Sequence, residues 1–304
     1  MTASDLAGRL GLAPELRMAS YAYREEFGRP ADVIGRVAGR VTLVANGPLR
    51  LSVATPWGAI AASGPAGDDV IELTRMQRPG ERERLTVRDA TAGLGPGWTG
   101  TGLRSARAGA RVLISCELPE GAGVGTTAAT EAAIARCLGD HGAAGFQEDP
   151  ATPCAMLGAR PLPFDLAAAG MRLIIISTET RSVTRPAPAE ASPMAAAARA
   201  LATGDFAAIG RLLTSAHYAL PGDRAQHGAA TAALRAGALG ARAITDGPGR
   251  PACALVPLSR LADVRTAVRA WFIREGLRPP RILSFTPATG SRQAWHEAKE
   301  RDIP

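Results

Sequence analysis

LPEGAGVGTTAA, residues 118–129, follows a run that predicts a buried strand at 111–119 and overlaps an alanine-rich predicted helix at 128–139. Glycine lets a backbone approach a phosphate closely and adopt positive φ. A helix N-terminus adds free N–H groups and a partial positive charge. We therefore predict that phosphate is bound by Gly121, Ala122, Gly123, Gly125, Thr126 and Thr127.

The two threonines leave two interpretations open. Their hydroxyls stand where one could reach a phosphate or a bound magnesium ion, and Thr127 is the candidate magnesium ligand. The alternative is a tight turn with a threonine as the helix N-cap. The loop lacks the Gly-Lys-Ser/Thr ending of a Walker loop, and it does not match the dinucleotide-binding fingerprint.

The rest of the chain alternates short β-like runs with helical ones, and few tandem βαβ signals occur, which favours an α+β fold. Strands are predicted at 33–45, 49–63, 68–76, 83–92, 171–180, 241–245, 252–257 and 281–288. Helices are predicted at 4–12, 15–28, 194–204, 206–220, 226–240 and 261–276. The stretch 139–165 is rich in proline and is predicted to be irregular.

The net charge of +7 comes almost wholly from arginine, since Lys299 is the only lysine. These arginines are scattered without a basic stripe or interleaved aromatics, which argues against nucleic-acid binding. The absence of a long apolar run or a signal peptide favours a cytoplasmic protein with no membrane contact. The four cysteines form no CxxC pair and are expected to be reduced, buried thiols.

The glycine loop resembles the second motif of the GHMP small-molecule kinases, P-x-G-x-G-L-x-S-S-A-A, with threonines in place of the serines. Other segments resemble galactokinases in the same chain order, namely 25–44, 162–180, 204–220, 236–257 and 278–292. This resemblance implies an α+β two-domain fold, with an S5-like domain at 1–165 carrying the phosphate loop and a ferredoxin-like domain at 166–304. It also implies a small-molecule ligand in the interdomain cleft, and ATP with magnesium as cofactor.

The residues that galactokinases use on the sugar do not match. Arg40 falls on the family arginine near the transferred phosphate, but the family's Glu, His and Asp fall on Asn46, Gly47 and Leu49. A sugar hydroxyl would lose its charge-assisted carboxylate partners. We therefore expect that ordinary galactose recognition is lost.

The catalytic segment and the third motif have also changed. No Met-Asp-Gln segment stands between the glycine loop and residue 165, so we place no catalytic aspartate. The third glycine cluster is replaced by DGPGRP at 246–251, where proline alters the turn and Asp246 adds a negative charge. The region 184–194 is short, which predicts a smaller lid.

Four candidate site residues remain outside the loop. His217 matches a family histidine, and it is either a site histidine near the nucleotide or a helix histidine packed between domains. Arg40 either clamps an anion or pairs with a local carboxylate. Asn46 and Arg50 are candidates for the substrate pocket.

Three functions fit these residues. The first is a galactokinase-like protein that has lost its activity and serves a small-molecule-binding or regulatory role, with a protein partner left open. The second is a repurposed enzyme acting on a specialised metabolite, and the third is a divergent ATP-dependent sugar or alcohol kinase. The cofactor is accordingly ATP with magnesium, or none.

Overall fold

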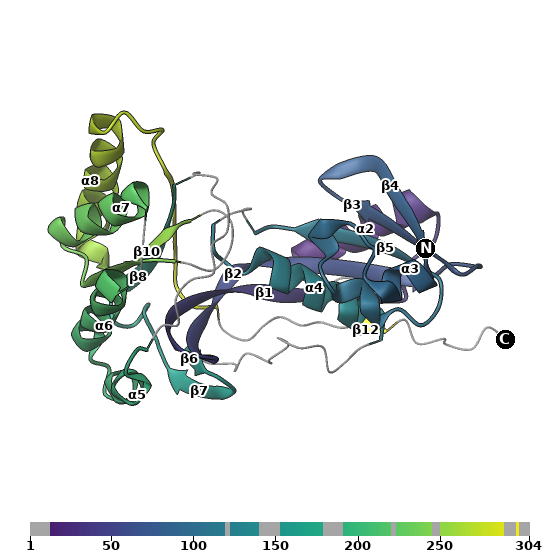
Figure 1. Cartoon of the computed structure of the whole chain (residues 1–304). Helices are drawn as coiled ribbons and strands as arrows, with labels where there is room; N and C mark the ends of the chain where they lie inside the picture. Colours follow the sequence, from purple (N-terminus) through teal and green to yellow (C-terminus); the bar gives the residue numbers. More distant parts are fainter. Residues whose placement is uncertain are drawn as a thin grey trace.

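The computed structural model describes residues 13–118, 122–139, 153–178, 191–219, 223–244 and 250–288, together with the backbone of 296–297. They form two sheets, each with its own helices, which occupy the right and left of Figure 1. Strands and helices alternate as predicted, and the fold is α+β. Within the described ranges, no helix has the length and apolar character needed to cross a membrane.

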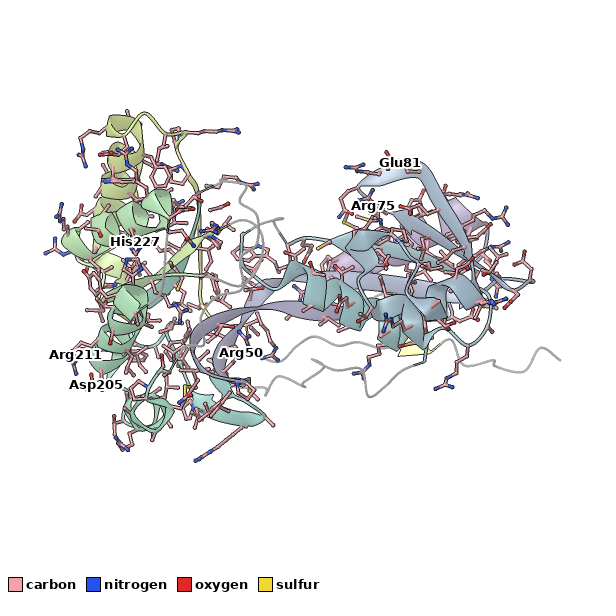
Figure 2. The ribbon with its side chains drawn as sticks, viewed as in Figure 1. Arg50, Arg75, Glu81, Asp205, Arg211 and His227 are labelled. Atoms are coloured by element: carbon pink, nitrogen blue, oxygen red, sulfur yellow. The ribbon has the colours of Figure 1, made fainter. Side chains whose placement is uncertain are left out.

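The first sheet is built on two long strands, β1 (Val33–Asn46) and β2 (Leu49–Pro65), which pair antiparallel. Its order is β12-β1-β2-β5-β3-β4, and β3 runs parallel to β5 while the other neighbours are antiparallel. The remaining strands on this path are β3 (Val70–Arg75), β4 (Arg78–Thr86), β5 (Ala110–Cys116) and β12 (His296–Glu297). Figure 2 shows Arg75 at the end of β3 and Glu81 on β4, far from Asp205 and from Arg211 on α6 (Phe206–Ala219).

Two helices sandwich this sheet because its strands alternate apolar side chains toward both faces. Helix α2 (Pro14–Phe27) begins at a proline and ends at Gly28, whose φ of 72° forms the predicted stop. Its Tyr23 packs in one cluster with Ile60 of β2. Ala59 and Ala61 of β2 belong instead to the main core with α4 (Thr126–Cys137).

The second sheet has the order β11-β8-β10-β9, and all neighbours are antiparallel. In Figure 1 its helices lie on the side away from the first sheet. Its strands are β8 (Met171–Ser177), β9 (Gly240–Ala243), β10 (Ala252–Pro257) and β11 (Arg281–Phe285). Its helices are α5 (Met194–Ala202), α6, α7 (Arg224–Arg235) and α8 (Leu261–Arg274). Residue 165 lies between β7 of the first sheet and β8 of the second, whereas β12, much further along the chain, pairs with β1 of the first sheet.

Three predicted elements were wrong. The strand predicted at 83–92 ends at Thr86, whose hydroxyl accepts a hydrogen bond from Asp89 N and caps helix α3 (Val87–Ala92). The helix predicted at 226–240 ends at Arg235, and Gly240 already belongs to β9.

The third error concerns 139–165, which is not wholly irregular. Its described part forms the hairpin β6 (Cys154–Leu157) and β7 (Arg160–Pro163), which turns at Gly158 with φ 58°. Among the described strands, β7 pairs with β6 alone, and proline is tolerated on such an edge strand. The sequence therefore did not predict β7, because Pro161 and Pro163 are unusual in a strand that is not at a sheet edge.

Candidate functional site

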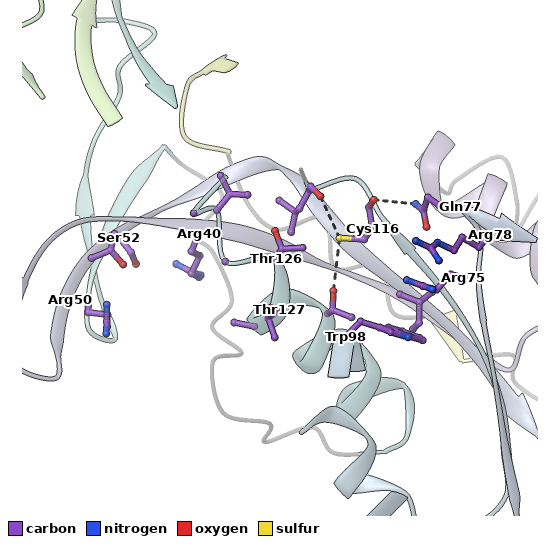
Figure 3. Close-up of a pocket in the computed structure, with 18 residues that line it drawn as sticks. Arg40, Arg50, Ser52, Arg75, Gln77, Arg78, Trp98, Cys116, Thr126 and Thr127 are labelled. Carbon is purple, nitrogen blue, oxygen red and sulfur yellow. Dashed lines mark hydrogen bonds between the residues drawn. The ribbon is translucent and has the colours of Figure 1, made fainter. Parts of the chain in front are cut away.

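A cavity of about 720 Å³ opens beside the N-terminus of α4 in the first domain (Figure 3). Its described walls come from β1 to β5, the turn at 97–99, the glycine loop and α4. The lining residues are Arg40, Thr42, Arg50, Ser52, Arg75, Gln77, Arg78, Trp98, Ile114, Cys116, Leu118, Gly123, Val124, Gly125, Thr126, Thr127, Ala128 and Thr130. These described lining residues all lie between 40 and 130, in the first domain.

The glycine loop is fixed to strand β1. Arg40 N donates to Val124 O at 2.9 Å. Gly125 is the N-cap of α4 with φ 69°, and a β-carbon built on it would stand 3.2 Å from Arg40 O. The threonine N-cap alternative is therefore wrong, because glycine occupies the cap and no side chain caps the helix. Gly121 lies outside the described residues.

The other predicted phosphate-binding residues meet at this helix end, except that Ala122 is buried and does not line the cavity. Thr126 and Thr127 occupy the first turn of α4, and both line the cavity. The first N–H groups of a helix have no partner within the helix, and they attract an anion. The geometry therefore suits a phosphate on this turn.

Four arginines line the cavity, namely Arg40, Arg50, Arg75 and Arg78. Among the described lining residues there is no aspartate, glutamate or histidine. Arginine matches phosphate oxygens with a planar fork of donors, and clustered cations raise the local concentration of an anionic ligand. The cavity is thus electrostatically suited to a ligand of several negative charges.

The cavity has two differently equipped ends. Figure 3 shows Arg50 and Ser52 at one end and Arg78 and Trp98 at the other, with Thr126 between them. The Trp98 ring is held in place because its Nε1–H donates to Glu83 Oε1 at 3.1 Å. The Arg75 guanidinium carbon lies over this ring, 5.0 Å from its centre, so an aromatic base would stack on the indole face that Arg75 does not cover.

Trp98, Arg75, Gln77 and Arg78 were not predicted from the sequence. Trp98 lies in a glycine-rich stretch that resembles an ordinary loop, and the two arginines belong to charges that looked scattered. The parallel pairing of β3 with β5 brings the arginines beside the glycine loop. Only the sheet order reveals this proximity.

Asn46 does not line the cavity. Its Nδ2 donates to Ser192 O at 3.2 Å, and Ser192 N donates to Ala45 O at 3.0 Å. The side chain in the position of the family's sugar-binding glutamate therefore fastens the segment that precedes α5. Of the two predicted pocket residues, Arg50 lines the cavity and Asn46 does not.

His217 lies away from the cavity, in the C-terminal domain. Its side chain is buried, its Nδ1 accepts a hydrogen bond from Ala243 N at 3.1 Å, and its Nε2 lies 3.0 Å from Nδ1 of His227. Because Nδ1 accepts, the neutral ring carries its proton on Nε2 and donates it to His227. Burial lowers the pKa of His217 to about 4, with further lowering by His227 and Arg242. This geometry favours a packed helix histidine, but its hydrogen-bond partners Ala243 and His227 lie in the same domain rather than across the domain boundary.

The described part of the third-motif region packs against the glycine loop. Ile244 N donates to Pro251 O at 2.8 Å, and Gln226 Nε2 donates to the carbonyls of both residues. The ring of Pro251 lies against Gly123. Asp246 and Pro248 lie outside the described residues.

The described residues fit a nucleotide better than they fit a magnesium ion. Helix α4 and the arginines match a polyphosphate, and Trp98 matches a base. Magnesium is commonly held by carboxylates together with phosphate oxygens, whereas the described lining offers side-chain hydroxyls such as that of Thr127. No group of three or more metal-ligating side chains occurs among the described residues.

Comparison with known proteins gives a consistent set of relatives, although no family model matches the chain. A galactokinase of Streptomyces coelicolor is 24% identical, and the match covers 89% of this chain and 96% of that protein. A galactokinase of Mycobacterium tuberculosis is 39% identical over 101 residues, which is 32% of this chain and 28% of that protein.

Solved structures extend the comparison to the whole fold. The galactokinase of Lactococcus lactis, complexed with galactose, superposes with a TM-score of 0.75 at 16% identity, over 92% of this chain and 100% of that one. A mevalonate kinase superposes with a TM-score of 0.56 at 12% identity, over 83% of this chain and 98% of that one. At these identities the likeness shows the fold.

Proposed function

We propose that this chain, which has the two-domain galactokinase-like fold of the GHMP kinases, binds a nucleoside phosphate and serves as a binding or regulatory protein that does not phosphorylate galactose. The observation that carries this proposal is the composition of the cavity. Four arginines and the N-terminus of a twelve-residue helix face it, and its described lining contains no carboxylate.

The bound nucleotide would follow the two ends of the cavity. Its phosphates would lie on the first turn of α4, within reach of Thr126, Thr127 and Arg40, with Arg50 toward the same end. Its base would lie beside Trp98. When bound to an active GHMP kinase, ATP supplies the transferred phosphoryl group.

Loss of phosphoryl transfer is supported by what the described site lacks. A general base must lie within hydrogen-bond reach of the hydroxyl that it deprotonates. The charge on a transferred phosphoryl group is neutralised by metal ions that carboxylates commonly hold. The described lining supplies no carboxylate, either as a general base or as a metal ligand. The Asn46 side chain donates to Ser192 O rather than pointing at a sugar.

Nucleotide titration by calorimetry tests the binding step. We expect ADP and ATP to bind, and we expect Arg50→Gln or Thr127→Val to weaken binding about tenfold, since each removes one polar contact to a charged group. Arg88→Gln is the matched control, because Arg88 is an exposed arginine outside the cavity lining. Absence of binding at millimolar nucleotide would contradict the proposed nucleotide-binding function.

A divergent sugar or alcohol kinase is the second candidate, supported by the exposed Thr127 hydroxyl at the α4 N-terminus. Incubation with Mg-ATP and a panel of sugars and alcohols, followed by measurement of ADP release, separates the two. Nucleotide binding without acceptor-dependent ADP release supports the binding protein. Release that depends on an acceptor and is lost in Thr127→Val supports the kinase.

A further inference from the structure

The turn between β3 and β4 holds two arginines over the cavity. Arg75 is the last residue of β3, Arg78 is the first of β4, and the two are paired across the hairpin. Met76 N donates to Ile114 O at 2.8 Å, and Gln77 Nε2 donates to Cys116 O at 3.1 Å. Both turn residues are thus fastened to β5, so the guanidinium groups are kept over the cavity rather than on a free hairpin.

This arginine pair is incompletely neutralised. The described ion pairs that it makes are both to Glu81, at 3.5 Å from Arg75 and 3.4 Å from Arg78. One carboxylate therefore faces two guanidinium groups, and one positive charge is left over. The side chain of Arg78 is 57% exposed, so an entering anion could reach it.

The pair also lies beside the predicted base position. The guanidinium carbon of Arg75 is 5.0 Å from the centre of the Trp98 ring. In Figure 3, Arg78 stands at the Trp98 end of the cavity, whereas Arg50 stands at the opposite end. A 5′-polyphosphate on the α4 N-terminus, with its base at Trp98, leaves the hairpin arginines next to the ribose and base without an anionic partner on the ligand.

We infer that the ligand carries a second phosphate on its ribose, at the 2′ or the 3′ oxygen, and that Arg75 and Arg78 bind this phosphate. The inference rests on the proposed function, because it assumes that a nucleotide occupies the cavity with its 5′-phosphates at α4. Two arginines directed at one phosphate form charge-assisted hydrogen bonds, which are the strong class of such bonds. The cavity volume of about 720 Å³ lies within the range that small-molecule and cofactor sites occupy.

Calorimetry with four ligands at one ionic strength tests the inference. We titrate the wild-type chain with ADP, ATP, 2′-phospho-ADP and 3′-phospho-ADP. ATP is the control, because its additional phosphate extends the 5′-polyphosphate rather than the ribose. We expect one of the two ribose-phosphorylated ligands to bind at least about tenfold more tightly than ADP. Which of the two ligands binds more tightly shows whether the second phosphate is on the 2′ or the 3′ oxygen of the ribose.

The variant Arg78→Gln assigns the gain to the hairpin. We expect it to abolish the preference for the ribose phosphate, so that the ribose-phosphorylated ligand and ADP bind this variant with affinities within about threefold of each other. Arg88→Gln, which removes an exposed arginine outside the cavity, should leave all four affinities unchanged.

Each remaining outcome overturns a defined statement. If ADP binds and neither ribose-phosphorylated ligand binds more tightly, the inference fails and the proposed function stands. If the preference persists in Arg78→Gln, the assignment to the hairpin arginines fails. If none of the four ligands binds, the proposed function fails as well.

Discussion

Pro251 of the C-terminal domain packs on Gly123 of the glycine loop. A β-carbon built on Gly123 would stand 2.6 Å from Cγ of Pro251, and Gly123 has a φ of 65°. The loop is thus enclosed between β1, through the bond from Arg40 N to Val124 O, and the remnant of the third motif. Glycine at 123 meets two requirements, a left-handed backbone and a close approach between domains.

Replacing Gly123 by alanine should therefore destabilise the chain and weaken nucleotide binding. A non-glycine residue in the left-handed region costs about 1–2 kcal/mol, and the methyl group would also displace Pro251. Urea unfolding measures the loss. Gly67→Ala is the matched control, since Gly67 has an ordinary φ and open space around its Cα. Equal midpoints for the two variants would contradict the contact.

Trp98→Leu should weaken nucleotide binding about tenfold or more, because stacking of a base on an aromatic ring contributes about 1–3 kcal/mol. Trp98→Phe should retain part of the affinity, since phenylalanine keeps a ring but loses the bond to Glu83 Oε1. Calorimetry with ADP measures both. Equal affinity in the leucine and wild-type proteins would place the base elsewhere.

His217 should make stability fall on acidification. Its pKa is about 4 in the folded chain and near 6.5 when unfolded, so the folded state binds fewer protons between those values. This contribution to stability is fully present above pH 6.5 and is lost as the pH falls toward 4. Its upper size is about 3 kcal/mol, because each pKa unit corresponds to about 1.4 kcal/mol.

Urea unfolding at several pH values between 7 and 4.5 tests this titration. His217→Gln keeps an acceptor for Ala243 N but removes the titrating ring, so its stability should depend less steeply on pH. Identical slopes for variant and wild type would show that other groups account for the acid sensitivity.

Much of the fold could be predicted from local patterns. The helix stop at Gly28 and the strand, glycine loop and helix around Thr126 depend on short-range chemistry that the sequence displays directly. The β6–β7 hairpin could not, because Pro161 and Pro163 argue against a strand unless its edge position is known. Edge position is a property of the whole sheet.

The candidate site divides in the same way. Thr127 and Arg40 belong to contiguous motifs and could be predicted, whereas Arg78 and Trp98 come together only through the order of the strands. Asn46 was expected in the pocket because it aligns with a sugar-binding position of galactokinases. The alignment does not predict that the backbone of Ser192 lies close enough to accept a hydrogen bond from the Asn46 side chain.

Arg242 joins the two domains, and its loss should loosen them. Its side chain is 2% exposed, its Nε donates to Ala243 O, and its Nη1 donates across the domain boundary to Leu43 O at 2.7 Å. Arg242→Met preserves much of the apolar stem but leaves those carbonyls without their donor. A buried polar group without a partner costs about 1–3 kcal/mol.

Thermal unfolding followed by calorimetry measures this effect. The methionine variant should unfold at lower temperature and, if the link couples the domains, with a broader transition than wild type. Arg211→Met is the matched control, because Arg211 on α6 is 71% exposed and its ion pair to Asp205 is long, at 3.8 Å. A transition as sharp and as stable as that of the control would mean that apolar contacts, such as Trp57 against Phe285, hold the domains without Arg242.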